Sequence, residues 1–169
     1  MAAGPARVRH GPEDVAPEIV RELSERLGGA IAELRQTAPR RLAGAVLADD
    51  VRTVLRALRD DLGCRHLSAL SGVDRGATLA VVYHLAARGG TVLSLTVSLP
   101  RDAPRLPSVT EVFPAANLYE REVHDLFGIV FEGHPDPRPL LLYEGWPEGE
   151  FPLRKDWKPR GREGTNARG

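Results

Sequence analysis

TLAVVYHLAARGGTVLSLTVSL, residues 78–99, has the pattern of a β-hairpin. Thr78–Ala87 is a long apolar run, and Thr91–Leu99 alternates apolar with polar side chains, which is the period of a strand with one buried face. Between them, Arg88-Gly89-Gly90 provides two glycines that tolerate the positive φ angles of a tight turn. The segment therefore predicts two long antiparallel strands joined at residues 88–90.

Further elements are predicted on the N-terminal side of this hairpin. Arg65–Val73 predicts a third strand, joined to the hairpin by a turn at Asp74–Ala77, and Leu42–Ala48 predicts a short strand. Two amphipathic helices are expected, one over residues 17–36 and one that Asp49 or Asp50 caps and that runs to Leu62. Their apolar stripes are Ile19, Leu23, Leu27, Ile31 and Leu34 in the first helix and Val51, Val54, Leu55, Leu58 and Leu62 in the second. This order predicts an α+β fold with helices packed on one face of a small, mostly antiparallel sheet.

On the C-terminal side, the sheet is expected to end at the prolines that follow residue 99. Ser108 and Glu111 have the spacing of a capping box and predict a capped turn. A helix is predicted over Ala115–Phe127, ended by Gly128, and a brief strand over residues 129–131. The side chains expected to face the core from this helix are Leu118, Tyr119, Val123, Leu126 and Phe127.

The sequence predicts three regions: a flexible N-terminal arm at 1–16, an α/β domain at 17–132, and an extended C-terminal arm at 133–169. Twelve of the last 37 residues are Pro or Gly, and no helical or strand period survives there. Both tryptophans of the chain nevertheless lie in this segment. Because a disordered linker rarely carries such apolar side chains, we expect an extended arm that buries them on a partner protein.

The composition excludes several classes of function. Lys and Arg total 23, as do Asp and Glu, so the charge balance argues against nucleic-acid binding. The single cysteine, Cys64, cannot hold an iron–sulfur cluster and favours a reducing compartment. No apolar window approaches the length of a membrane span, and no glycine-rich phosphate loop follows a strand. We expect no cofactor in this chain, and membrane contact only through partners.

The helix of residues 115–127 concentrates charge, and three interpretations of it stay open. Glu120 and His124, four residues apart, could bind a metal together with His134, although no further ligand is evident. Alternatively, the charged side chains form ordinary solvent-exposed ion pairs. A third possibility is a buried polar network that fixes this helix to the loop at 133–138 or to a partner, with Arg121 and Arg138 each clamping a carboxylate.

EREVHDLFGIVFEGHPDPR at 120–138, followed by PLRKD at 152–156, resembles the signature of the 30 kDa-type subunit of respiratory complex I, which is the C subunit of NADH–quinone oxidoreductase. The resemblance implies an α/β domain without catalytic residues, flavin or iron–sulfur clusters, which partner subunits carry. It also implies packing against the 49 kDa-type quinone-site subunit, on the cytoplasmic side of the cell membrane, in support of electron transfer to quinone. The residues it suggests for subunit contact or for fixing the fold are Glu120, Arg121, Glu122, Asp125, His134, Asp136, Arg138, Arg154, Lys155 and Asp156.

Three rival assignments stay open. PRPL at 137–140 and WPEG at 146–149 are also similar to the matching domain of membrane-bound, energy-converting nickel–iron hydrogenases, in which partner subunits carry the nickel–iron centre. A free-standing metal-dependent enzyme built on Glu120, His124 and His134 is the rival of a different class. A generic adaptor outside any redox complex is the third alternative.

Overall fold

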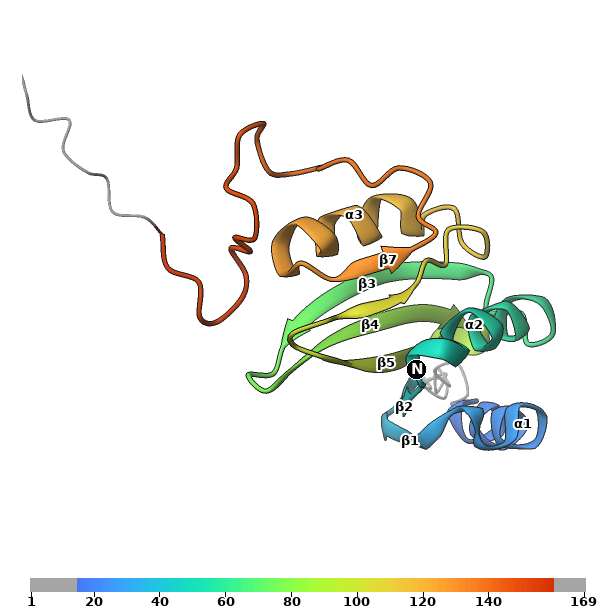
Figure 1. Cartoon of the computed structure of the whole chain (residues 1–169). Coiled ribbons are helices and arrows are strands. Elements are labelled where there is room, and N and C mark those ends of the chain that lie inside the picture. The colour runs from blue at the N-terminus through green and yellow to red at the C-terminus, as the bar shows by residue number, and fades with distance from the viewer. Residues whose placement is uncertain (1–14, 160–169) are drawn as a thin grey trace, which may run out of the picture.

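The computed structural model describes residues 15–159 and has an α+β fold (Figure 1). Five strands form one sheet in the order β1-β2-β5-β4-β3, in which only the β2–β5 pair is parallel. These strands are β1 Ala32–Ala38, β2 Arg41–Ala45, β3 His66–Asp74, β4 Thr78–Ala87 and β5 Thr91–Pro100. Two short parallel strands, β6 Arg105–Pro107 and β7 Val130–Glu132, pair separately. The predicted fold class is confirmed.

Three α-helices and three 3₁₀ turns complete the described part of the chain. The helices are α1 Ala16–Leu27, α2 Val51–Asp60 and α3 Ala116–Phe127, and the turns are η1 Gly28–Ala30, η2 Ala48–Asp50 and η3 Arg88–Gly90. The turn η3 joins β4 to β5, as expected from its two glycines. No helix within residues 15–159 has the length and apolar character needed to cross a membrane.

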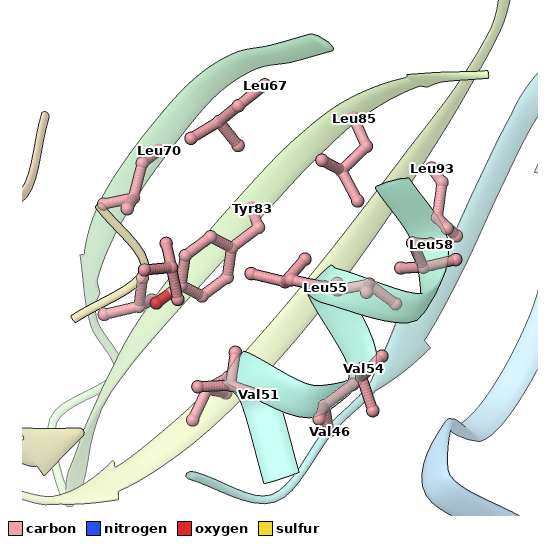
Figure 2. Packing of buried hydrophobic residues seen from close by; sticks show 14 of the residues in the cluster. Val46, Val51, Val54, Leu55, Leu58, Leu67, Leu70, Tyr83, Leu85 and Leu93 are labelled. Carbon is pink, nitrogen blue, oxygen red and sulfur yellow. The ribbon is translucent and has the colours of Figure 1, made fainter. Parts of the chain in front are cut away.

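The core lies between the β4–β5 hairpin and the helices. Alternate residues of the hairpin are fully or almost fully buried, while intervening residues such as Val82, His84 and Thr96 stay partly exposed. From α2, Leu55 and Leu58 point toward this face of the hairpin, and Leu55 is the nearer of the two to Tyr83 (Figure 2). The buried hairpin side chains on this face are Leu79, Val81, Tyr83, Leu85, Leu93, Leu95, Val97 and Leu99. Full burial of each Leu or Val contributes roughly 1.5–3 kcal/mol, so this hairpin dominates the stability of the fold.

The first predicted helix was too long. It ends at Leu27, because Gly28 adopts a φ of 51° that breaks the helical path. The chain then enters β1, and Ile31 reaches the core from a non-helical backbone. Ile31 and Leu34 continued the helical spacing by chance, which made the stripe look longer than the helix.

Two predicted caps were also wrong. Asp50 precedes α2 but makes no side-chain cap hydrogen bond, since the 3₁₀ turn η2 leads into the helix instead. The Ser108–Glu111 capping box does not form, because the Ser108 backbone N–H donates to the Glu132 carbonyl at 2.8 Å. The Ser108 hydroxyl instead accepts a hydrogen bond from the Thr110 N–H at 3.3 Å.

The third predicted helix matches α3 to within one residue, but its inward face differs. Gly128 has a φ of 67° and ends α3 with its N–H donating to the His124 carbonyl at 2.8 Å. Leu118, expected inside, is 55% exposed, whereas Glu120 and Asp125 are buried. The helix therefore turns two carboxylates inward, and this places a polar cluster at its contact with the rest of the chain.

The two predicted arms differ in how far the structure describes them. Residues 1–14 and 160–169 lie outside the described part, and Ala16 already belongs to α1. Residues 133–159 contain no helix or strand and loop past α3 (Figure 1). Docking of this segment, called the C-terminal arm below, on partner subunits stays a prediction.

Candidate functional site

Asp125 fixes residues 140–142 of the C-terminal arm to α3. Its side chain is buried, and Oδ2 accepts hydrogen bonds from the backbone N–H groups of Leu140 and Leu141 at 2.8 Å and of Leu142 at 3.3 Å. Hydrogen bonds to an ionised acceptor are roughly twice as strong as neutral ones, so three converging amides form a strong attachment. The recognised groups are backbone amides, which any non-proline residue supplies.

Arg121, one turn earlier on α3, holds residues 136–139 in the first part of the arm. Its guanidinium donates to the carbonyls of Arg138 at 2.8 Å and Pro139 at 2.9 Å, and it lies 3.3 Å from an Asp136 carboxylate oxygen. Arg138 clamps Asp136 with two parallel hydrogen bonds of 2.7 and 2.8 Å. These bonds, with the nearby Arg121 charge, hold the pKa of Asp136 well below its usual range. Arg138 thus has the expected bidentate geometry, while Arg121 mainly binds carbonyls.

The end of β3 provides a second attachment point, which binds the later part of the arm at residue 155. Asp74 is buried and accepts hydrogen bonds from the N–H groups of Gly76 at 2.7 Å and Lys155 at 2.8 Å, and from Arg101 at 2.8 Å. The Lys155 and Arg101 hydrogen bonds hold the pKa of Asp74 well below its usual range. Arg101 also binds Asp156. Asp74 and Arg101 were not among the predicted site residues, because the local sequence around Asp74 indicates only a turn.

The arm also covers the C-terminal end of α3, where the last carbonyls of a helix lack partners within the helix. Arg154 Nε donates to the Phe127 carbonyl at 2.7 Å, and the Leu153 N–H donates to the Leu126 carbonyl at 3.1 Å. The Arg154 guanidinium lies 4.5 Å from the centroid of the Phe151 ring. That ring packs so closely on Gly128 that a side chain there would collide with it. Burial lowers the pKa of Arg154.

Glu120 occupies the interior beneath α3. It is 0% exposed, and its Oε1 accepts a hydrogen bond from the Val109 N–H at 2.7 Å. Oε2 has no hydrogen-bond partner among residues 15–159 and lies 3.9 Å from His134 Nε2. Burial raises the pKa of Glu120 to about 7, so the carboxyl is partly protonated at neutral pH.

The hydrogen bonds of His134 determine its tautomer. Nδ1 accepts from the Asp136 N–H at 3.0 Å, so the ring proton sits on Nε2, which donates to the Asn117 carbonyl at 3.1 Å. His134 is therefore neutral in this arrangement and gives Glu120 no compensating charge. Its role is to connect the loop to the first turn of α3.

The residues of the metal-site alternative do not form a set of metal ligands. His124 Nδ1 binds the Ile129 carbonyl at 2.9 Å, and both nitrogens of His134 are already engaged. Among residues 15–159, no three His, Cys, Asp or Glu side chains are grouped as a metal ion requires. The geometry instead favours the buried polar network. Two of the predicted site residues take little part in it, since Glu122 is exposed and Lys155 contributes its backbone N–H.

Comparison with known proteins agrees with this architecture. At 39% identity the chain is similar to the C subunit of F(420)H(2) dehydrogenase from Methanosarcina mazei, over 85% of this chain and 92% of the relative. It is 45% identical to the C subunit of NADH-quinone oxidoreductase from Methylobacterium sp. strain 4-46, over 80% of this chain and 64% of that protein. The chain thus spans slightly less than two thirds of this second relative.

Two solved structures share the fold. A chain of the membrane-bound sulfane sulfur reductase, an archaeal respiratory membrane complex, superposes with a TM-score of 0.75 at 31% identity, over 84% of this chain and 85% of that one. A trypsin-resistant fragment of Nqo5 superposes with a TM-score of 0.59 at 33% identity, over 69% of this chain and 96% of the fragment. The model of the respiratory-chain NADH dehydrogenase 30 kDa subunit family matches residues 45–163. With most of its length matched, the chain belongs to this family.

Proposed function

We propose that this chain is a cofactor-free structural subunit in the hydrophilic arm of a complex I-like NADH–quinone oxidoreductase. In this role it packs against the 49 kDa-type quinone-site subunit on the cytoplasmic side of the membrane and supports electron transfer without performing it. The family assignment and the names of the relatives support a place in such a complex. The buried carboxylates of Asp125 and Asp74 then have a structural task, which is to hold the C-terminal arm in shape.

The exposed apolar side chains of the arm carry this proposal. Leu141 is 57% exposed, Tyr143 66% and Leu153 52%, and Leu118 of α3 is 55% exposed. An exposed apolar surface of this kind is typical of a protein–protein contact. The hydrogen bonds to Asp125 and Asp74 order the backbone in advance, so less conformational entropy is lost when a partner binds. The arm is thus preshaped for docking.

The equivalent subunit of a related complex with a different electron donor is the second candidate. The share of each relative that this chain matches favours this second candidate. The F(420)H(2) dehydrogenase relative is matched over 92% of its length and the sulfane sulfur reductase chain over 85%. The similarity of residues 137–140 and 146–149 to energy-converting nickel–iron hydrogenases belongs to the same alternative. The docking role is common to all of these, and the partners distinguish them.

Affinity purification of the tagged chain from mild-detergent extracts of its own cells, followed by mass spectrometry, tests the proposal. We expect a 49 kDa-type subunit to copurify, together with flavin- and iron–sulfur-bearing NADH dehydrogenase subunits. A nickel–iron subunit without the NADH module would assign the chain to the hydrogenase branch. Recovery of the chain alone, with a stoichiometric metal, would contradict the docking role.

A matched pair of variants locates the docking surface. Leu141→Asp places a charge on the arm, whereas Leu47→Asp places one on a leucine between β2 and η2 that is even more exposed (73%). We expect L141D to lose most of the copurified subunits and L47D to retain them. Equal retention by both variants would exclude the arm as the docking surface.

A further inference from the structure

The C-terminal arm spans an open hollow. Residues 140–142 are tied to Asp125 through their backbone amides. Further along the arm, Leu153 and Arg154 bind the carbonyls at the end of α3. Between these attachments the chain bulges away and leaves a hollow of about 570 Å³, bounded by residues 139–151 and by the adjoining part of α3. Figure 1 shows this bulge beyond α3. A span fixed at both ends around such a space has the form of a hoop.

The wall of the hoop has a distinctive chemistry. Three aromatic side chains line it, Tyr143, Trp146 and Phe151, and the rings of Tyr143 and Trp146 meet edge to face at 5.6 Å. Glu144, Glu148 and Glu150 also belong to the lining, with Asp125 and His124 of α3, whereas no Lys or Arg does. This combination favours a cation that is flat enough to stack on a ring.

Two of these carboxylates are free to receive a new partner. Glu144 and Glu148 are exposed and form no ion pair with any residue between 15 and 159. Glu150 has a structural task, since its carbonyl accepts from Trp146 Nε1 at 2.8 Å and its carboxylate from Trp157 Nε1 at 3.2 Å. The Trp146 and Trp157 rings stack with centroids 6.1 Å apart, which ties the bulge to residue 157. The hoop therefore keeps its shape while Glu144 and Glu148, two residues of its lining, stay exposed to solvent.

We propose that the hoop encloses an arginine-bearing segment of a neighbouring subunit, with the guanidinium stacked on the exposed ring of Tyr143 and paired with Glu144 or Glu148. The volume supports a segment rather than one side chain, because it lies within the 300–1,000 Å³ range of sites that hold whole ligands. Arginine fits better than lysine, since its planar group stacks on rings and binds carboxylates through two parallel hydrogen bonds. The inference rests on the proposed docking role and specifies the chemistry of the partner.

Charge reversal in the assembled complex tests the inference. Glu144→Lys with Glu148→Lys is compared with Glu25→Lys with Glu111→Lys, which reverses two exposed carboxylates on α1 and on the turn after β6. Partner retention is measured on the affinity resin across a salt series. We expect the hoop variant to retain at least about tenfold less partner at physiological salt, since charge reversal turns an attractive ion pair at the interface into a like-charge contact. The control variant should match the wild type.

The failures of the two proposals are distinguishable. If the wild-type chain captures no partner, the docking role itself is wrong. If the wild-type chain captures its partner and the hoop variant does so equally well, the role stands and this inference is wrong. Cryo-electron microscopy of the wild-type complex provides a second measurement. An empty hoop, or one filled by a segment without a basic residue, would overturn the inference.

Discussion

Glu120→Gln tests how the buried carboxyl beneath α3 affects stability. A carboxyl with an ordinary pKa of 4.5 in the unfolded chain and a pKa of about 7 in the folded chain binds its proton more tightly when folded. This pKa difference does not change the unfolding free energy below pH 4.5, where the carboxyl is protonated in both the folded and the unfolded chain. As pH rises towards 7 the unfolded chain ionises first, so the folded state loses stability at this site. Above pH 7 the loss is complete and amounts to about 3 kcal/mol.

Glutamine removes this titration and keeps most of the geometry. Its carbonyl oxygen can still accept the Val109 N–H, and its amide group replaces the oxygen that lacks a partner among residues 15–159. We therefore expect the difference in unfolding free energy between E120Q and the wild type to grow in favour of E120Q by about 3 kcal/mol between pH 4.5 and pH 8. A constant offset between the proteins is compatible with the reasoning, since the new amide is itself buried.

Urea unfolding of the full chain at pH 4.5, 6, 7 and 8 measures this difference. Glu122→Gln is the matched control, because Glu122 is exposed two residues away on the same helix. The acidic groups with a lowered pKa, Asp60, Asp74 and Asp136, titrate equally in all three proteins and cancel in the comparison. Parallel stability profiles for E120Q and the wild type would refute the assignment of a raised pKa to Glu120.

Three further changes probe the attachment of the arm. Asp74→Asn should destabilise the chain by about 2 kcal/mol, as expected for lost hydrogen bonds to a charged group, and should accelerate hydrogen exchange at the Lys155 amide. Because the pKa of Asp74 is lowered on folding, this difference should be present above pH 4 and should shrink on acidification, as pH-dependent unfolding would show. Asp125→Ala should leave the thermal unfolding of the core nearly unchanged and increase proteolysis within residues 139–151, which limited trypsin and chymotrypsin digestion would detect. Gly128→Ala places a side chain at a φ of 67° and against the Phe151 ring, and should lower the unfolding free energy measured by calorimetry by at least about 1–2 kcal/mol. Gly145→Ala, at a φ of 93° with no neighbouring atoms, is the control and should lack the part of this loss that comes from packing.

Local patterns allowed much of the fold to be predicted. The β4–β5 hairpin follows from alternation and two glycines, and α3 follows from its stripe and from Gly128. The end of α1 was missed, because Ile31 and Leu34 preserve a helical spacing beyond the residue that breaks the helix. The spacing of apolar residues carries no information about backbone angles, so the predicted helix ran past Gly28.

The site was harder to predict, because it depends on contacts between distant residues. The Asp74–Lys155 hydrogen bond joins residues 81 positions apart, and nothing in the local sequence of either residue indicates it. The burial of Glu120 and Asp125 contradicts the usual rule that charged residues of an amphipathic helix face water. Interpreting the charges of α3 as a buried network pointed to the correct helix but did not reveal which carboxylates turn inward.

The recognition of backbone amides by Asp125 has an evolutionary consequence. The attachment makes no demand on the side chains at 140–142, except that the residues are not proline. Substitutions on the outward surface of the arm can therefore accumulate without loosening it. A scaffold of this kind can diverge to meet new neighbours one residue at a time, which suits a family whose relatives serve dehydrogenases with different electron donors.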